Sequence, residues 1–209
     1  MESLNADRLA DEAIKYPSKI RQIVSLLYND DMERRFVAVK ALGAIAGREP
    51  ELMSQRWERV FHSFDDTMSC WGAAEALGEI ARNMPQQNRT RIIQFLRNFR
   101  RDDCSCMGYL WGMCRICQID QRWVEGFVPK LQSLVLSANI CIRGQALWAL
   151  GELRIKEAAG RMKECLGDEG ETWYYDNEAV CRKKIKTIAG EALEKLGRGK
   201  GSSGVRHKD

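Results

Sequence analysis

Tryptophan, arginine and carboxylate side chains recur at matching positions along this 209-residue chain, a combination typical of surfaces that bind another protein. The candidate partner-binding residues are Trp71, Trp111, Trp148, Arg115, Glu75, Glu79, Glu152, Tyr174 and Tyr175. Within this set we expect Glu79 and Glu152 to select basic or amide groups of a partner. The first hypothesis is therefore recognition of a peptide, a helix or a protein loop.

Four of the eight cysteines indicate a second kind of chemistry, the binding of a soft metal ion or an iron–sulfur cluster. Cys70, Cys104, Cys106 and Cys141 all lie at amino ends of predicted helices, where free amides and the helix dipole favour thiolate. Equivalent atoms on packed helices are about 10 Å apart, however, whereas a zinc–sulfur bond is about 2.3 Å long. We therefore expect no cofactor and keep the metal site as an alternative.

Other catalytic groups are sparse. The two histidines are His62, predicted on an outer helix, and His207 near the carboxyl end. They form no Ser-His-Asp, Cys-His or His-rich metal pattern, and no glycine-rich phosphate loop joins a strand to a helix. The composition of candidate sites favours a binding protein over an enzyme.

The elements that must position these residues are marked by an internal repeat. The segments 41–46, 76–81 and 149–153 share the pattern Ala-Leu-Gly followed by an aliphatic residue two positions later. Equivalent positions are Gly43, Gly78, Cys114 and Gly151, at intervals of 35, 36 and 37 residues, and a weaker copy places Glu194 after a further 43. Similarity at such a spacing indicates a solenoid.

Each repeat contains two stretches with apolar residues at helical spacing, separated by an acidic or amide-rich turn. The turns, whose side chains are expected to cap the following helix, are 29–31, 65–66, 102–103, 139 and 176–177. A helix pair of this length cannot bury its apolar face alone, so successive pairs must stack. The predicted fold is all-α, an α-solenoid of about five stacked helix pairs with an N-terminal capping helix.

These residues resemble the HEAT repeat family, particularly the bacterial branch named for phycobilisome lyases. Its pattern is an acidic turn, an arginine and Ala-x-x-Ala-Leu-Gly-x-Ile, which is matched by Asp31, Arg35, Ala38, Ala41-Leu42-Gly43 and Ile45. A second copy has Arg143, Ala146, Ala149-Leu150-Gly151 and Leu153. The resemblance covers roughly residues 18–196. It implies an armadillo-like helical scaffold with a protein partner, and as an alternative a tetrapyrrole lyase or chaperone-like role.

The repeat register also predicts which face of each inner helix lines the groove. Counting from Arg35 and its equivalents, the first, fifth and ninth following positions form one stripe on the concave surface. Trp111 and Trp148 are equivalent residues of adjacent repeats, so their rings are expected about 10 Å apart, with room for a ligand or a partner side chain. The alternative is that these tryptophans fill a tightly curved groove as core residues.

The last repeat contains about six extra residues, including the aromatic run Glu171 to Asp176 in the turn between its helices. Such a run could form a lid or a contact loop. Alternatively Trp173 and Tyr174 cap the end of the core, which we expect more of Trp173 than of the tyrosines. Cys114 and Cys117 replace small buried residues of other repeats, so they are expected in the core despite their CxxC spacing.

Composition and charge set the domain organisation. We expect an N-terminal capping helix over 1–17, the solenoid over 18–196 and a flexible basic tail over 197–209. Four basic residues and one acidic residue in the tail account for three of the four net positive charges, so nucleic acid is not an expected partner. No signal segment and no run of about 20 apolar residues occurs, which predicts a cytoplasmic protein without a membrane partner.

Overall fold

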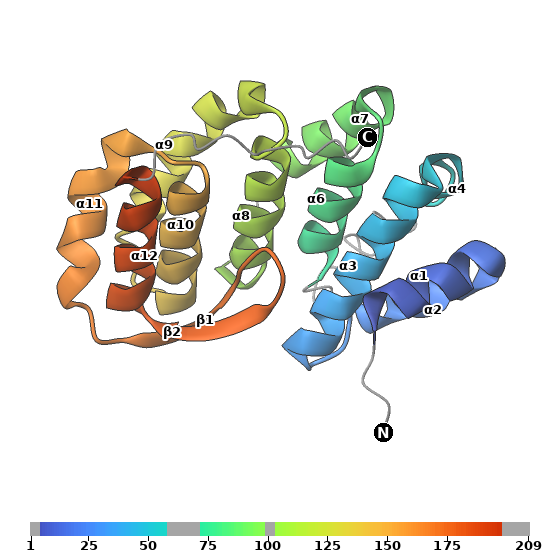
Figure 1. Ribbon diagram of the computed structural model, residues 1–209, viewed down its shortest axis with the longest axis horizontal. Coiled ribbons are helices and arrows are strands. Elements are labelled where there is room, and N and C mark those ends of the chain that lie inside the picture. Colours follow the sequence, from blue (N-terminus) through green and yellow to red (C-terminus); the bar gives the residue numbers. More distant parts are fainter. Residues whose placement is uncertain (1–4, 58–71, 99–102, 198–209) are drawn as a thin grey trace, which may run out of the picture.

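A computed structural model describes residues 5–57, 72–98 and 103–197, and helices make up most of these residues (Figure 1). The α-helices are α1 (Ala6–Lys15), α2 (Ile20–Leu26), α3 (Met32–Arg48), α4 (Pro50–Ser54), α6 (Ala73–Asn83), α7 (Gln86–Asn98), α8 (Asp103–Cys117), α9 (Val124–Leu134), α10 (Ile140–Glu152), α11 (Ala159–Glu164) and α12 (Ile185–Gly197). The predicted, mostly helical solenoid is confirmed.

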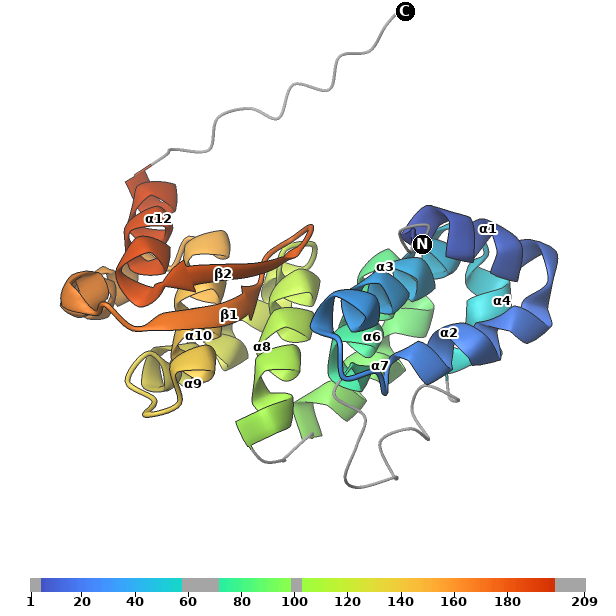
Figure 2. The ribbon, with the colours of Figure 1, turned by 90° about the horizontal axis from the view of Figure 1, so that it is seen from below.

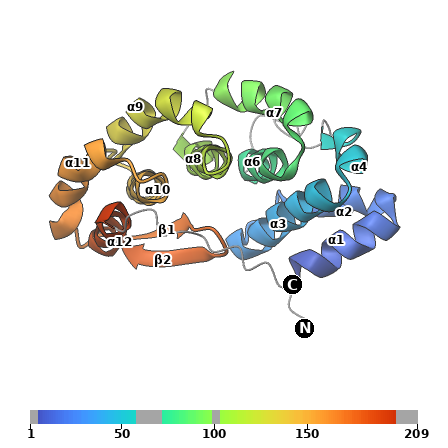
Figure 3. The same ribbon diagram turned by 45° about the horizontal axis from the view of Figure 1, so that its top comes forward.

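The helices form an inner and an outer layer, as expected of stacked helix pairs. The inner helices α3, α6, α8, α10 and α12 follow one another around an arc, and α4, α7, α9 and α11 lie outside them (Figure 3). Each inner helix packs directly on the next one along the chain. Helix α1 precedes the first pair and packs on α3, to which Arg48 ties it by ion pairs of 2.6 Å to both Asp7 and Asp11.

Two of the three fully described turns that were predicted to cap an inner helix do so. The side chain of Asp31 accepts hydrogen bonds from the backbone amides of Glu33 and Arg34, and Asn139 does the same for Cys141 and Ile142. Those interactions satisfy amides that have no partner within the helix. The predicted caps at 65–66 and 102 lie outside the described residues, as does the tail from residue 198.

The arginine of the repeat pattern holds the same turn from the other side. Arg35 donates to the carbonyl oxygens of Asn29 and Asp30, at 2.5 and 3.1 Å. Arg143 donates to the carbonyl of Ser137 at 2.5 Å and to the carboxylate of Asp168 at 2.8 Å. The arginine therefore fixes the loops that lead into α3 and α10.

Glycine at the register position allows neighbouring inner helices to approach closely. A Cβ atom added to Gly78 would lie 2.2 Å from the Cα atom of Gly112 on the next helix. At Gly151 it would lie 2.7 Å from the Cα atom of Ala192. The Ala-Leu-Gly pattern is thus required by backbone contact between α6 and α8 and between α10 and α12.

The aromatic insertion of the last repeat is a β-hairpin, which an all-α prediction does not contain. Strands β1 (Glu171–Tyr175) and β2 (Val180–Lys184) pair antiparallel, with Glu171 opposite Lys184 and Tyr175 opposite Val180. The hairpin does not border one edge of the groove. It extends from α12 across the inner side of α10 and α8 towards α3 (Figure 2).

The local sequence explains this strand structure. Glu171 and Trp173 are exposed, whereas Thr172 and Tyr174, which alternate with them, are buried. This is the alternation of a strand with one covered face. Asp176 and Asn177 were expected to cap the last inner helix, and that prediction is wrong. The Asp176 carboxylate instead accepts hydrogen bonds of 2.7 Å from the amides of Glu178 and Ala179 and closes the hairpin turn.

None of the helices in the described part of the chain is both long and apolar enough to cross a membrane.

Candidate functional site

The concave face of the solenoid is occupied by the tip of the chain's own hairpin. Three consecutive backbone carbonyls of the tip each accept a hydrogen bond from a different inner helix. Gln145 on α10 donates to the carbonyl of Tyr175 at 3.0 Å, Trp111 on α8 to that of Asp176 at 2.6 Å, and Lys40 on α3 to that of Asn177 at 3.1 Å. Gln145 also accepts from the amide of Tyr175 at 2.8 Å. The inner helices therefore bind the main chain of this segment.

An aromatic pocket holds the side chain of Tyr175. Its ring stacks on Phe36 with centroids 5.6 Å apart and planes at 11°, and lies 6.2 Å from the ring of Trp111. Phe36 and Trp111 meet edge to face at 5.4 Å. Burial raises the pKa of Tyr175, and the nearby Glu75 carboxylate raises it further. Tyr175 thus packs on two residues of the predicted stripe, Phe36 and Trp111, whereas the prediction had placed a ligand or a partner side chain between Trp111 and Trp148.

Glu75 lies beneath this pocket and is almost completely buried. Burial raises the pKa of Glu75 to about 7, against the lowering effects of its own backbone amide, Arg35 and Tyr175. Its Oε2 atom has no hydrogen-bond partner among the described residues. Space for the carboxylate comes from Gly108, where a Cβ atom would lie 2.2 Å from Oε2. A charged group in such a place is costly unless it is paired.

A network of charged and amide groups surrounds the Asn177 side chain at the end of the hairpin. Its Oδ1 atom accepts from Arg115 at 2.6 Å and from Gln118 at 3.1 Å, and its Nδ2 atom donates to Glu152 at 2.9 Å. Lys195 on α12 pairs with the same carboxylate of Glu152. Both hydrogen-bonding ends of Asn177 are therefore satisfied by the concave face.

Glu79 joins this network to the neighbouring repeats. It accepts two hydrogen bonds from Arg115 and lies 3.3 Å from Lys40 and 3.6 Å from Arg82. Burial alone would raise the pKa of Glu79, but the hydrogen bond and charge of Arg115, with the charges of Lys40 and Arg82, hold it below its usual value. Glu79 is a paired anion inside the molecule.

Those predicted partner-binding residues that the structure describes are consequently buried or half-buried. Trp111 is 0% and Trp148 4% exposed, and an open tryptophan-lined groove is not what the structure shows. The physical reason is the hairpin, which covers the stripe. Glu79 and Glu152 bind Arg115 and Lys195, so they are not free to select a partner's basic groups. Trp71 lies outside the described residues.

Within the aromatic run, Trp173 was expected to cap the end of the core more than the tyrosines, and the structure shows the reverse. Trp173 is 42% exposed, with the Arg182 guanidinium 5.7 Å above its ring, whereas Tyr174 and Tyr175 are buried. Tyr174 and Trp148 instead border a cavity of about 160 Å³ between the hairpin, α10 and α12. Its other lining residues are Glu152, Asp176, Asn177, Glu178, Lys183, Glu191 and Lys195.

The cysteines of the CxxC pair lie where the sequence predicted them. Cys114 and Cys117 are buried core residues, which confirms that prediction. Burial raises the pKa of Cys114 well above its usual value and that of Cys117 to about 12. Of the proposed metal ligands only the Cys141 side chain is described, and it is half-buried. In the described ranges no group of three or more His, Cys, Asp or Glu residues is placed to hold a metal ion. The metal alternative stays a prediction.

Sequence reasoning missed Gln145 and assigned Asn177 to a different role. Gln145 lies outside the predicted stripe, but it is a fully buried amide next to the apolar run 146–150 of α10. Such a side chain must find hydrogen-bond partners, and this requirement was the available signal. Asn177 could have been found from the turn-forming Asp-Asn pair between two β-prone runs.

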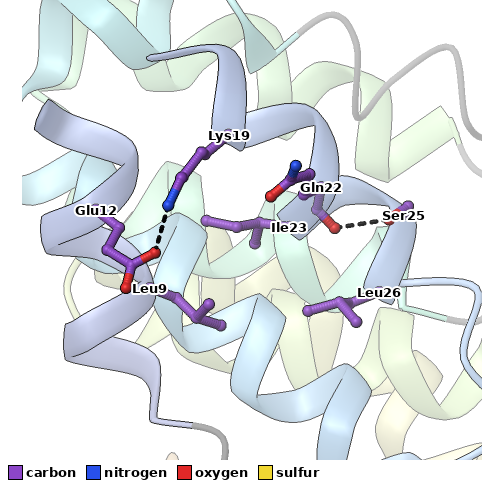
Figure 4. Close-up of a pocket in the computed structure, with 7 residues that line it drawn as sticks. All are labelled: Leu9, Glu12, Lys19, Gln22, Ile23, Ser25 and Leu26. Atoms are coloured by element: carbon purple, nitrogen blue, oxygen red, sulfur yellow. Dashed lines mark hydrogen bonds and ion pairs between the residues drawn. The ribbon is translucent and has the colours of Figure 1, made fainter. Parts of the chain in front are cut away.

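A second cavity, of about 250 Å³, lies between α1 and α2 at the other end of the molecule and was not predicted (Figure 4). Leu9, Ile23 and Leu26 form its apolar wall, and Lys19 and Glu12 form an ion pair of 2.7 Å across its rim (Figure 4). The hydrogen bond and charge of Lys19 hold the pKa of Glu12 below its usual value.

Comparison with known proteins supports the repeat assignment. The family profile described as PBS lyase HEAT-like repeat matches residues 142–168, which include the second copy of the pattern from Arg143 to Leu153. A crystal structure described as that of an engineered protein superimposes with a TM-score of 0.50 and 19% identity, over 92% of this chain and 88% of that one. That likeness concerns the fold alone. No curated protein matches the chain.

Proposed function

Since the chain is a HEAT-repeat protein of the PBS lyase HEAT-like branch, we propose that it is a non-catalytic scaffold that binds an extended segment of a protein partner. Solenoids of this kind present concave surfaces suited to such binding. The site is the concave face between α3 and α10, and the hairpin tip occupies it in the absence of a partner.

The observation that supports this proposal is the set of hydrogen bonds to three consecutive carbonyls. Gln145, Trp111 and Lys40 contact the backbone of residues 175–177, which every peptide shares. Side chains that bind a main chain give affinity for an extended segment, and pockets beside it give specificity. The concave face therefore has the donors that peptide binding needs.

Binding to this face requires that the partner take the place of the hairpin tip. The apparent affinity for a partner then equals the intrinsic affinity multiplied by the fraction of molecules in which the tip has left the face. The tip contributes one aromatic ring and one amide side chain to the concave face, so a partner with equivalent groups replaces its contacts without leaving buried polar groups unpaired.

The test uses a variant that removes only the tip. Tyr174 and Cys181 are paired residues of the hairpin, so Tyr175–Val180 can be replaced by Asn-Gly, which forms a two-residue type I′ turn between paired strands. We call this form the tip-shortened variant. It keeps the buried Thr172 and Tyr174 side chains, and the helical circular-dichroism signal and urea unfolding verify its fold.

Panning a random peptide library on the tip-shortened variant should enrich peptides that bind it. A matched control carries Gln145→Leu in addition, which removes the main-chain contact at similar volume, and should lose most of the enriched peptides. The proposal is wrong if no peptide is enriched on a folded variant, or if the enriched peptides bind the Gln145→Leu form equally well.

The metal and tetrapyrrole alternatives remain predictions. The described contacts between the concave face and the hairpin are made to peptide and protein side-chain groups, and none of them favours either ligand. Elemental analysis of anaerobically purified protein tests the metal alternative. Stoichiometric iron or zinc that is lost on replacing Cys104 and Cys106 would establish it.

A further inference from the structure

The hairpin tip also indicates which partner segment the concave face recognises, an inference that rests on the proposed function. The tip is a segment bound to the concave face. Its described hydrogen bonds with the inner helices come from Tyr175, Asp176 and Asn177, and Glu178 lies 3.8 Å from Lys40. At each of the first three positions the inner helices contact either the side chain or the backbone alone.

The first position is read as an aromatic side chain. Tyr175 is 3% exposed, and its ring is held by Phe36 from α3 and Trp111 from α8. Stacked and edge-to-face contacts of this kind add to the burial of the ring area. An aliphatic side chain would fill the pocket incompletely and leave Phe36 and Trp111 without their partner surface.

The hydroxyl group distinguishes tyrosine from phenylalanine at this position. The Tyr175 side chain is 3% exposed, so its hydroxyl needs hydrogen-bond partners inside the pocket, where burial, Glu75 and Arg35 all influence its pKa. Within the described part of the chain the Oε2 atom of Glu75 has no hydrogen-bond partner, so loss of the hydroxyl would leave a buried carboxyl group less satisfied still. A site built to bond a hydroxyl discriminates strongly against an analogue that lacks it.

The second position is read through its backbone only. The carbonyl of Asp176 is held by Trp111, but the carboxylate serves its own turn, through the amides of Glu178 and Ala179 and the thiol of Cys181. The inner helices make no described hydrogen bond to this side chain. Any residue that supports a tight turn satisfies the position.

The third position is read as an asparagine. Its oxygen accepts from Arg115 and Gln118, and its nitrogen donates to Glu152. An aspartate there would set a second carboxylate against Glu152, and a serine would be too short to span the same partners. We infer that the concave face recognises a partner segment that presents Tyr-x-Asn in a tight turn.

The probe is a fluorescein-labelled cyclic peptide that contains the sequence of residues 175–180 between two cysteines joined by a disulfide. It is titrated into the tip-shortened variant and followed by fluorescence anisotropy. The parent peptide should bind, and its Tyr→Phe and Asn→Asp forms should each bind at least about 10-fold more weakly, because the first removes a hydroxyl beside the buried Glu75 and the second sets a carboxylate against Glu152. A peptide changed only from Asp to Ser at the second position should bind within a few-fold of the parent.

The outcomes separate this inference from the proposed function. Equal binding of the parent, Phe and Asp peptides overturns the Tyr-x-Asn inference and leaves peptide binding in place. If library-selected peptides bind but the parent cyclic peptide does not, the inference is likewise wrong. If neither kind of peptide binds a folded variant, the proposed function fails as well.

A second measurement covers the case in which the tip-shortened variant does not fold. In the otherwise intact chain, Tyr175→Phe and Asn177→Asp should each speed amide hydrogen exchange in β1 and β2 by at least about 10-fold, since both weaken the docked tip. Glu157→Gln, at an exposed position outside the hairpin, is the control and should not change the exchange rate. Unchanged exchange in both test variants would overturn the inference.

Discussion

Arg115 on α8 and Glu79 on α6 form an ion pair through two hydrogen bonds, of 2.9 and 3.1 Å, in which both side chains are only 3% exposed. The pair joins two adjacent repeats and at the same time orients the Arg115 nitrogen that donates to Asn177. A structural contact between repeats and the recognition of the hairpin tip thus depend on the same guanidinium group.

Replacing Arg115 by methionine should destabilise the fold. The change leaves the Glu79 carboxylate buried with only Lys40 and Arg82 beside it, at 3.3 and 3.6 Å. Breaking a buried pair commonly costs 3–5 kcal/mol, and because two cations remain we expect a loss of about 3 kcal/mol in the free energy of unfolding. Urea denaturation followed by circular dichroism measures it.

The exposed pair of Lys184 and Glu169 provides the comparison, since these side chains are 49% and 60% exposed. Lys184→Met should cost no more than about 1 kcal/mol, as solvent-exposed pairs do. A double variant, Arg115→Met with Glu79→Leu, should regain much of the stability because no buried charge is left. Equal effects of Arg115→Met and Lys184→Met would contradict the interpretation.

Alanine at Gly78 should be among the most damaging small substitutions in the chain. The new Cβ atom would lie 2.2 Å from the Cα and 2.8 Å from the carbonyl carbon of Gly112, so α6 and α8 would have to separate. We expect a loss of about 3 kcal/mol in the free energy of unfolding. Gly190, within α12, has nothing within 4 Å of its added Cβ, and Gly190→Ala should stabilise by about 0.5–1 kcal/mol. Thermal unfolding of both variants would show shifts of the same sign if this packing were wrong.

The buried Glu75 should make stability depend on pH near neutrality. The folded chain keeps the Glu75 proton up to about pH 7, whereas the unfolded chain releases it near the usual pKa of 4.5. Between these values the unfolded state binds fewer protons, so stability falls as the pH rises, in total by about 3 kcal/mol. The free energy of unfolding measured by urea at pH 5 and pH 8 tests this expectation.

Glu75→Gln isolates that effect because the amide cannot titrate. The difference in unfolding free energy between wild type and Glu75→Gln should change with pH across this window. The unfolding free energy of Glu75→Gln should itself depend less on pH than that of the wild type. Glu157→Gln, at an exposed position, should behave as the wild type does. A pH profile of Glu75→Gln that is parallel to that of the wild type would show that Glu75 does not titrate there.

How far the sequence predicts this molecule can be stated from particular residues. The register of Gly43, Gly78 and Gly151 predicts the inner helices, because close helix contact leaves a repeating trace in the sequence. Asp31 and Asn139 predict helix starts, since capping acts within a few residues. The positions of Phe36 and Trp111 on one stripe follow from the same local periodicity.

What covers that stripe is a long-range relationship, and the repeat pattern does not contain it. Asp176 and Asn177 lie more than 60 residues from Trp111 and Arg115 in the chain, and their hydrogen bonds form only after the solenoid has curved. The hairpin is also absent from the other described repeats, so the repeat pattern assigns its residues to a turn between helices. Periodicity alone therefore cannot decide whether Trp111 and Trp148 are exposed.

The cysteines of the CxxC segment should be unreactive in the native protein. Cys114 and Cys117 are 0% and 1% exposed, and burial raises the pKa of both, so little thiolate is present at pH 8. Iodoacetamide at pH 8 should label them only after denaturation in guanidinium chloride, whereas the half-buried Cys141 should be labelled in the native state. Mass-spectrometric mapping of the labelled peptides measures each site. Native labelling of Cys114 or Cys117 as fast as that of Cys141 would mean that the contact between α8 and α10 opens readily, because the Cys114 thiol faces the Ala149 carbonyl across it.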